Sequence, residues 1–242
     1  MNLPSGKVIE FYNQFITEQI KSGINDRIYH LFKRLLALGL NSHSNVLELG
    51  SGIGAMTVLL SKKLREGRVE AVDLSPQSIE FSRQRIKSPN VSFVVADVVN
   101  YKPSIQQIDF VTLFDILEHV PVDQHPDLFQ NIASVANDQT RILINIPNPA
   151  YIEYDMINHP QSLQIIDQAL LLSTLLKNLD KNGLTLSYFE TYSIWVENDY
   201  QFMVIEKRKE FKEIDLNSKR NFFQKILKKL ARTYVRLRHK YP

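Results

Sequence analysis

The sequence predicts an α/β fold built on a doubly wound, mostly parallel sheet of seven strands that ends in an antiparallel hairpin. Short apolar runs alternate with helical patterns from residue 45 onward, which is typical of parallel strands joined by crossover helices. Three closely spaced glycines follow the first apolar run, and two longer strand patterns come last. With 242 residues and 44% apolar content, the chain can bury one sizeable core, so we expect one main domain with appendages.

Two helices are predicted ahead of the sheet, because apolar residues recur at helical spacing over residues 8–20 and 25–40. We expect residues 1–43 to form a helical cap before a sheet domain of residues 44–206. Strands follow at 45–49, 68–73, 91–97, 108–115 and 140–147, with helices near 54–66, 76–87 and 123–136. Ser75 should cap the second of these helices, with Pro76 at its first position.

The end of the domain is predicted as one more helix and a pair of strands. The helix lies near 164–182 and is ended by Asn182 and Gly183. The strands, at 184–195 and 200–208, are separated by a loop of residues 196–199 that is short enough for an antiparallel hairpin.

Charge is distributed unevenly along the chain. Residues 207–242 hold 13 Lys or Arg against 3 Asp or Glu, whereas residues 1–206 hold 16 against 23. Residues 207–242 include a predicted basic amphipathic helix that starts at a Ser218 cap. It fits an anionic membrane surface best, at the inner face of the membrane. Docking on protein and binding of nucleic acid are the alternatives, with nucleic acid the least favoured.

The cysteine count and the hydropathy bear on where the protein acts. There is no cysteine, which excludes disulfides and thiolate metal sites. No stretch approaches the roughly 18 apolar residues of a membrane span, so we expect a cytoplasmic protein.

The glycine turn after the first strand predicts a ligand site, because glycines let backbone N–H groups approach a ligand at a helix start. Gly50, Gly52 and Ala55 match the dinucleotide pattern, with Asp73 placed for a ribose. Two further carboxylates favour another ligand. Glu48 lies where it would face a cation, and Asp97 ends the third strand, where it can accept from an exocyclic amine.

Four motifs, "VLELGSGIG", "AVDLS", "ADV" and "DILEHVP", together resemble class I S-adenosylmethionine-dependent methyltransferases of the group that includes ubiquinone-type and small-molecule O-methyltransferases. The resemblance covers roughly residues 44–206 and implies a Rossmann-like methyltransferase fold that binds S-adenosylmethionine. It implies that the cofactor is surrounded by Glu48, Gly50, Ser51, Gly52, Gly54, Asp73, Leu74, Asp97, Val98 and Phe114. For Leu74, Val98 and Phe114, plain core packing is the alternative.

Methyl transfer from a sulfonium needs mainly alignment of the reactants and exclusion of water, and a base only when the acceptor must lose a proton. His119 is the best-placed base, with a cap or packing role as the alternative, and Asp115 is a second polar group on the same loop. Glu118 beside His119 suggests a magnesium-like ion only weakly, so we predict no metal.

The acceptor is expected under a lid of residues 148–168, which is longer than a connector requires. Tyr151, Tyr154 and His159 of the lid, together with Tyr12, are predicted to contact it; His159 has a purely structural alternative. Arg27 is predicted on a solvated helix face, with a contact to the cofactor carboxylate as the alternative.

These features predict O-methylation of a hydroxyl on a small molecule or a glycan, such as a surface-polysaccharide intermediate. The alternatives are methylation of a quinone-type phenol or of a carboxylate. Two alternatives come from other functional classes: an NAD-dependent oxidoreductase and a non-catalytic binding module.

Overall fold

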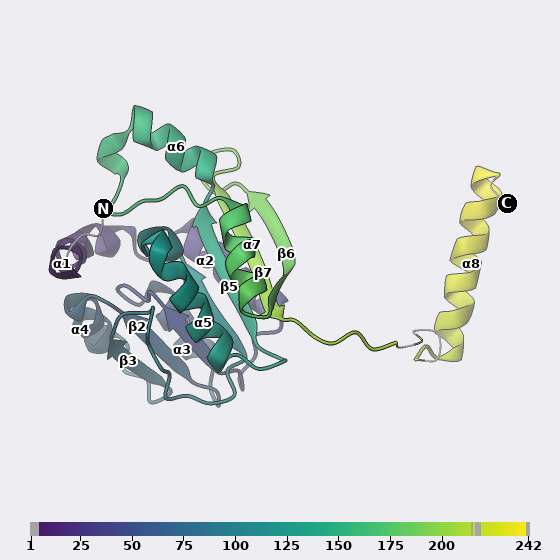
Figure 1. Ribbon diagram of the computed structural model, residues 1–242. Coiled ribbons are helices and arrows are strands. Elements are labelled where there is room, and N and C mark those ends of the chain that lie inside the picture. The colour runs from purple at the N-terminus through teal and green to yellow at the C-terminus, as the bar shows by residue number, and fades with distance from the viewer. Residues whose placement is uncertain (1–4, 214, 216–218, 241–242) are drawn as a thin grey trace. The chain divides into compact units, whose positions relative to one another are not determined.

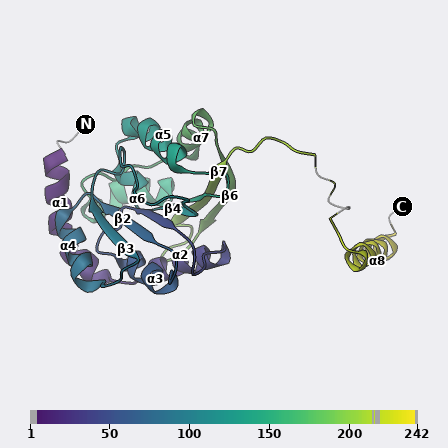
Figure 2. The ribbon, with the colours of Figure 1, turned by 90° about the horizontal axis from the view of Figure 1, so that it is seen from below.

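The computed structural model describes residues 5–213, 215 and 219–240. The chain divides into two compact units, Met1–Arg208 and Lys209–Pro242, and each is described by itself. The first unit contains the whole sheet and the second contains one helix (Figures 1 and 2).

The first unit is built on a seven-stranded sheet in the order β3-β2-β1-β4-β5-β7-β6. The pairs from β3 to β5 are parallel, and β7 is antiparallel both to β5 and to β6. The predicted fold class, including the terminal hairpin, is therefore confirmed. The strands are β1 Val46–Leu49, β2 Val69–Asp73, β3 Val91–Val95, β4 Phe110–Phe114, β5 Arg141–Pro147, β6 Leu184–Tyr192 and β7 Tyr200–Lys207.

Helices lie on both faces of the sheet, with α5 and α7 on one face and α2 and α3 on the other (Figures 1 and 2). Ser75 caps α4 as predicted, since its Oγ accepts a hydrogen bond of 3.1 Å from the Ser78 N–H. The helices of this unit are α1 Ser5–Ser22, α2 Asp26–Ala37, α3 Ala55–Lys63, α4 Pro76–Arg85, α5 His125–Val135, α6 Pro149–Asn158 and α7 Leu172–Lys181. Short 3-10 turns occupy Leu117–His119, Val122–Gln124 and Pro160–Ser162.

Two apolar clusters form the core, one on each face of the sheet, because successive strand side chains point to opposite faces. Val46 of β1 packs in the cluster that includes Leu31 of α2 and Leu60 of α3. Leu47, the next residue, packs in the cluster that includes Phe129 of α5 and Leu179 of α7. This double packing fixes the register of β1 and hence the position of the glycine turn that follows it.

Two predictions for residues 148–182 were wrong in detail. The predicted helix over 164–182 begins only at Leu172, because earlier backbone groups are held by other contacts. The Gln164 N–H donates to Asp167 Oδ2 at 2.6 Å, and the Gln168 N–H donates to the Glu118 carbonyl at 3.2 Å. The expected lid loop contains α6, which is capped by the Asn148 side chain and has Pro149 in its first turn.

The second unit contains α8, Phe222–His239. A reciprocal pair of contacts caps it: the Asn221 side chain accepts from the Gln224 N–H, and the Gln224 side chain accepts from the Asn221 N–H. The cap is thus Asn221, and the predicted Ser218 cap lies outside the described residues. Within the described residues, no helix has the length and apolar character needed to cross a bilayer.

Candidate functional site

A cavity of about 600 Å³ opens at the carboxyl ends of the parallel strands. Its walls come from α1, the glycine turn, the ends of β2 and β4, the 3-10 turn 117–119, the segment 162–167 and the start of β7. Its volume is in the range of small-molecule sites, and its position is where ligands bind in open α/β sheets.

The glycine turn between β1 and α3 forms the floor of this cavity. Gly50 has φ +77° and lies against Ile116, so that a Cβ at Gly50 would come within 2.8 Å of the Ile116 side chain. Gly52 has φ +52°, and its N–H donates to Asp73 Oδ2 at 2.7 Å. The backbone conformation and the close approach both require glycine at position 50.

Three carboxylates lie beside the turn. Glu48 is buried, and burial raises its pKa to about 8, although the Thr57 hydroxyl donates to it at 2.7 Å. Burial also raises the pKa of Asp73, while N–H donors from Ser75 and Gly52 oppose that shift. Asp97 lines the cavity at the end of the next strand. The turn therefore faces a strongly acidic group of side chains.

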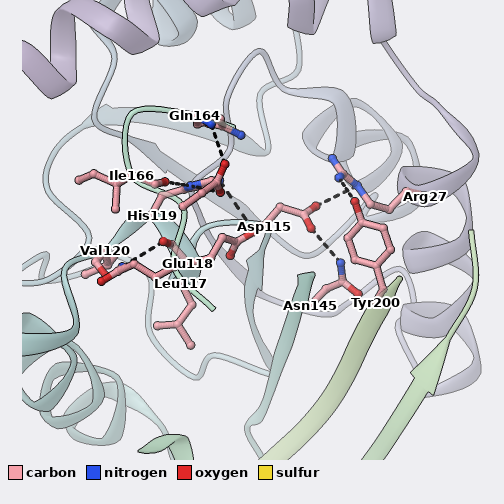
Figure 3. Close-up of polar contacts among 12 residues, drawn as sticks. Arg27, Asp115, Leu117, Glu118, His119, Val120, Asn145, Gln164, Ile166 and Tyr200 are labelled. Carbon is pink, nitrogen blue, oxygen red and sulfur yellow. Dashed lines mark hydrogen bonds and ion pairs between the residues drawn. The ribbon is translucent and has the colours of Figure 1, made fainter. Parts of the chain in front are cut away.

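A second cluster of buried polar side chains surrounds Asp115 at another wall of the same cavity (Figure 3). Arg27 Nε lies 2.9 Å from Asp115 Oδ2, and Asn145 Nδ2 donates to Asp115 Oδ1 at 3.0 Å. The Arg27 guanidinium also donates to the Tyr200 hydroxyl at 2.7 Å and lies 5.4 Å from the centre of the Trp195 ring. Burial opposes the charge of Arg27, but Asp115 and Tyr200 raise its pKa overall. The prediction that Arg27 lies on a solvated face was wrong.

His119 lies in the 3-10 turn that follows β4, with its side chain 6% exposed. Its Nδ1 is 2.5 Å from the Ile166 carbonyl (Figure 3). The same nitrogen is 3.3 Å from Asp167 Oδ1. A carbonyl only accepts, so Nδ1 carries the proton and Nε2 is the basic nitrogen. Burial lowers the pKa of His119, and Asp167 opposes that shift. Burial therefore favours the neutral imidazole, and the Ile166 carbonyl fixes its tautomer.

The turn that carries His119 is held from both sides. His125 Nε2 lies 2.9 Å from the Val120 carbonyl and 3.2 Å from the Leu117 carbonyl. The Gln168 side-chain amide donates to the Glu118 and Val120 carbonyls at 3.0 and 2.7 Å. These contacts explain why residues 163–171 are not helical and why the backbone that carries the His119 imidazole is fixed.

Several buried polar atoms at the cavity have no hydrogen-bond partner. They belong to residues that line it from four different segments: Tyr12 Oη, Gln19 Oε1, Ser51 Oγ, Thr112 Oγ1 and Glu118 Oε2. Buried polar groups are nearly always satisfied, and each exception calls for an explanation. Their concentration here indicates a polar ligand. Among the described residues, no three His, Asp or Glu side chains are arranged to hold a metal ion.

The structure brings most of the predicted site residues together. His119, Asp115, Tyr12 and Tyr151 line the cavity, as do nine of the ten predicted cofactor residues: Glu48, Gly50, Ser51, Gly52, Asp73, Leu74, Asp97, Val98 and Phe114. Gly54 does not line it; a Cβ there would come within 2.9 Å of Ser82 Oγ, so this glycine allows α3 and α4 to pack closely.

Two predicted lid residues do not line the cavity. Tyr154 is 54% exposed. His159 contacts Asp155 Oδ1 at 2.9 Å, which fits its structural alternative. Sequence reasoning missed Trp195 and Tyr200 as cavity residues, because β6 was expected to continue through Trp195 and nothing in the pattern links β7 to α2.

Comparisons with known proteins agree with this geometry. Residues 46–139 match the family model described as a methyltransferase domain. The chain is 28% identical to malonyl-[acyl-carrier protein] O-methyltransferase 1 of Ilyobacter polytropus, over 81% of this chain and 74% of the relative. It is 31% identical to trans-aconitate 2-methyltransferase of Escherichia coli, over 43% of this chain but only 39% of that enzyme.

Solved structures share the fold. Magnesium protoporphyrin IX methyltransferase from Synechocystis PCC 6803, with bound SAH, superposes with a TM-score of 0.65 at 16% identity, over 84% of this chain and 99% of that chain. A TehB-like SAM-dependent methyltransferase from Corynebacterium glutamicum gives 0.59 at 18% identity, over 84% and 99%.

Proposed function

Because this chain is a class I S-adenosylmethionine-dependent methyltransferase, we propose that it methylates a hydroxyl of a small-molecule or glycan acceptor with His119 as general base. The observation that carries the proposal is the fixed tautomer of His119 at the wall of the cavity. With Nδ1 bound to the Ile166 carbonyl, Nε2 can accept the proton that a hydroxyl loses as its oxygen is methylated. The NAD-dependent alternative is abandoned, since residues 46–139 match a methyltransferase domain.

The residues around the glycine turn fit S-adenosylmethionine. The Ser51 hydroxyl is a buried, unpartnered group in the cavity, and the turn offers backbone amides to an anionic carboxylate. In this proposal Asp73 accepts from ribose hydroxyls and Asp97 from the adenine amine. Glu48 faces the positive charges of the methionine part. The bound cofactor supplies a methyl group on an activated sulfonium.

In this proposal the acceptor occupies the part of the cavity that is lined by α1 and by residues from 151 to 167. In this proposal residues 1–43 form a helical cap, residues 148–168 form the acceptor lid, and Tyr12 and Tyr151 contact the acceptor. The Tyr12 ring lies edge-on to the His119 ring, 6.2 Å between centres, so an acceptor held by Tyr12 is next to the proposed base. The proposal for Tyr154 and His159 is withdrawn, since neither lines the cavity.

Charge favours a hydroxyl acceptor over a carboxylate. The cavity is lined by eight carboxylate side chains and one guanidinium, that of Arg27, which is already paired with Asp115. Burial raises the pKa of Glu48, Asp73, Asp115 and Glu118, so these groups do not all repel an anion. With the Arg27 guanidinium paired, however, no other described Lys or Arg lines the cavity to bind an anionic acceptor, which favours a neutral sugar or alcohol. Polar lid groups such as Gln164 and Asp155 suit a saccharide.

Carboxylate methylation is the second candidate function, and the relatives favour it. Malonyl groups and trans-aconitate both carry carboxylates, and the two enzymes are named for methylating them. A carboxylate acceptor is already anionic and needs no base, so the two candidates differ in whether His119 matters.

The test is a screen for S-adenosylhomocysteine release with neutral sugars and alcohols, and with dicarboxylates and malonyl thioesters. On the active acceptor, His119→Gln should lower kcat by about 10² to 10⁴ while the dissociation constant for S-adenosylhomocysteine stays close to that of the wild type. His43→Gln is the matched control, since His43 is 68% exposed and lies outside the cavity. Turnover of carboxylates alone, with His119→Gln fully active, would establish the second candidate instead.

A further inference from the structure

The C-terminal helix α8 carries a feature that the methyl-transfer site does not explain. Over its 18 residues it contains no Asp or Glu and six Lys or Arg, and none of its residues is buried within its own unit. Large apolar side chains are exposed along it, from 39% at Ile226 to 75% at Leu237. Single exposed apolar residues are common on helix surfaces, but a contiguous row of large apolar side chains along one helix calls for a partner.

The two kinds of side chain occupy opposite sides of α8. At about 100° per residue, seven of the eight exposed large apolar side chains fall within about 140° of the helix circumference, and Val235 is the exception. The cations fall almost entirely on the remaining side. The apolar face consists of Phe222, Phe223, Ile226, Leu227, Leu230, Tyr234 and Leu237; the basic face consists of Lys225, Lys228, Lys229, Arg232 and Arg236, with Arg238 at the border between them.

We propose that α8 is an interfacial anchor, which lies in the plane of a membrane surface rich in anionic lipids with its apolar face in the acyl boundary. A helix with a strong polar face, cations on that face and Phe or Leu on the other binds in this way. The cations then lie beside the lipid phosphates, whose negative surface potential attracts basic segments. The anchor would bring the protein to a membrane surface. This proposal does not depend on which acceptor the protein methylates.

The charges of α8 argue for an anionic lipid surface over the other partners. A second copy of the helix would bring six cations against six with no acidic side chain to pair them, which opposes a coiled-coil seam. Nucleic acid would neutralise the basic face and leave the apolar face in water. An anionic bilayer is complementary to both faces at once.

The cap of α8 is consistent with a helix that forms without help from the rest of the chain. Asn221 and Gln224 satisfy each other's backbone N–H groups at its start, and Lys240 ends it in a left-handed conformation. The apolar face gives too short and too interrupted an apolar stretch to cross a bilayer, and no described helix meets that requirement. The geometry therefore fits a helix that lies on the membrane rather than one that spans it.

The experiment is co-sedimentation of the full chain with vesicles of phosphatidylcholine alone and of phosphatidylcholine with 30% phosphatidylglycerol. We expect at least tenfold tighter binding to the anionic vesicles, weakened by raised salt. Lys228→Glu/Lys229→Glu/Arg232→Glu should abolish the preference for anionic lipid, and Leu227→Ser/Leu230→Ser should weaken binding at least tenfold. Both variants should bind S-adenosylhomocysteine like the wild type.

The matched control is Lys177→Glu/Lys181→Glu, which reverses two exposed charges on α7 and should bind vesicles almost as the wild type does. Equal binding of all variants, or no vesicle binding by the wild type, would overturn the proposal. If the wild type does not bind vesicles but forms a dimer in sedimentation equilibrium, and Leu227→Ser/Leu230→Ser dissociates that dimer, the helix would be assigned to self-association instead. Tight binding of duplex DNA by the Leu227→Ser/Leu230→Ser variant, without lipid binding by the wild type, would assign the helix to nucleic acid.

Discussion

Arg27 and Asp115 form an ion pair across the cavity wall, with 2.9 Å between Nε and Oδ2. Arg27 comes from α2, ahead of the sheet, and Asp115 follows β4, where its φ of +54° turns the chain sharply. The pair thus ties the N-terminal helices to the turn that carries His119. Because both side chains are mostly buried, each depends on the other to compensate its charge.

The first prediction concerns the stability of this pair. Arg27→Ala leaves the Asp115 carboxylate buried without its cation and should lower the free energy of unfolding by about 2 to 4 kcal/mol. Asp115→Asn should also destabilise, although Asn tolerates the positive φ and can still accept from Asn145. The double variant should lose at least about 1 kcal/mol less than the sum of the single losses.

Urea denaturation of the four proteins measures this coupling. The exposed pair Lys21 and Glu18, whose side chains are 67% and 60% exposed, provides the control, with a coupling below about 1 kcal/mol. Additive losses for Arg27 and Asp115 would mean that the two charges are solvated independently.

The strands were predictable because they are short apolar runs between turn signals, and their alternation with helical patterns predicted a mostly parallel sheet. The segment from 148 to 171 was harder to predict. Asn148 and Pro149 are a helix-start signal, but the polar and aromatic mixture that follows them favoured a loop. The absence of helix at 164–171 depends instead on contacts of Gln168 with the 3-10 turn, which no local pattern records.

The second prediction separates backbone strain from steric overlap in the glycine turn. Gly183 has φ +63°, and a Cβ added there would meet nothing within 4 Å, so Gly183→Ala should cost only about 1 to 2 kcal/mol of unfolding free energy. Gly50→Ala carries the same kind of strain and also overlaps the Ile116 side chain. It should cost clearly more, and Ile116→Ala in the same chain should recover part of the difference. Equal losses of unfolding free energy for Gly50→Ala and Gly183→Ala would show that the glycine turn rearranges easily to accommodate a Cβ.

The third prediction concerns cofactor affinity. Asp73 accepts from the Gly52 and Ser75 N–H groups, so Asp73→Ala removes two bonds that shape the turn as well as the proposed ribose contact. A hydrogen bond to a charged group is worth about 1.5 to 3 kcal/mol, so the dissociation constant of S-adenosylhomocysteine should rise at least about tenfold. Calorimetric titration measures it, with Asp138→Ala in an exposed loop as the control. An unchanged constant for Asp73→Ala would place the cofactor elsewhere.

The glycine-turn wall of the cavity was predictable from sequence because its residues are close together in the chain. Glu48, Gly50 and Gly52 lie within one strand and its turn, so spacing alone brings them together. The wall around Arg27 is assembled from distant segments: Arg27 meets Tyr200 only because β7 inserts between β5 and β6. That arrangement depends on tertiary packing, which a linear pattern of residue types does not contain.

The last prediction concerns how the free energy of unfolding changes with pH. The direction of this change follows from the pKa of Glu48. Burial raises the pKa of Glu48 from 4.5 to about 8 in the folded chain. Between these pH values the folded state holds a proton that the unfolded state has released. The free energy of unfolding therefore falls as pH rises through this window, by up to about 1.4 kcal/mol per pH unit from Glu48.

Glu48→Gln removes this titration while its amide oxygen still accepts from the Thr57 hydroxyl, which donates at 2.7 Å in the wild type. Urea denaturation between pH 5 and 8 should then give a flatter decline for Glu48→Gln than for the wild type. Glu10→Gln, which changes an exposed carboxylate on α1, should leave the wild-type slope unaltered. Parallel pH profiles for wild type and Glu48→Gln would mean that Glu48 ionises at an ordinary pH, and that the acidic wall of the cofactor site is solvated rather than dry.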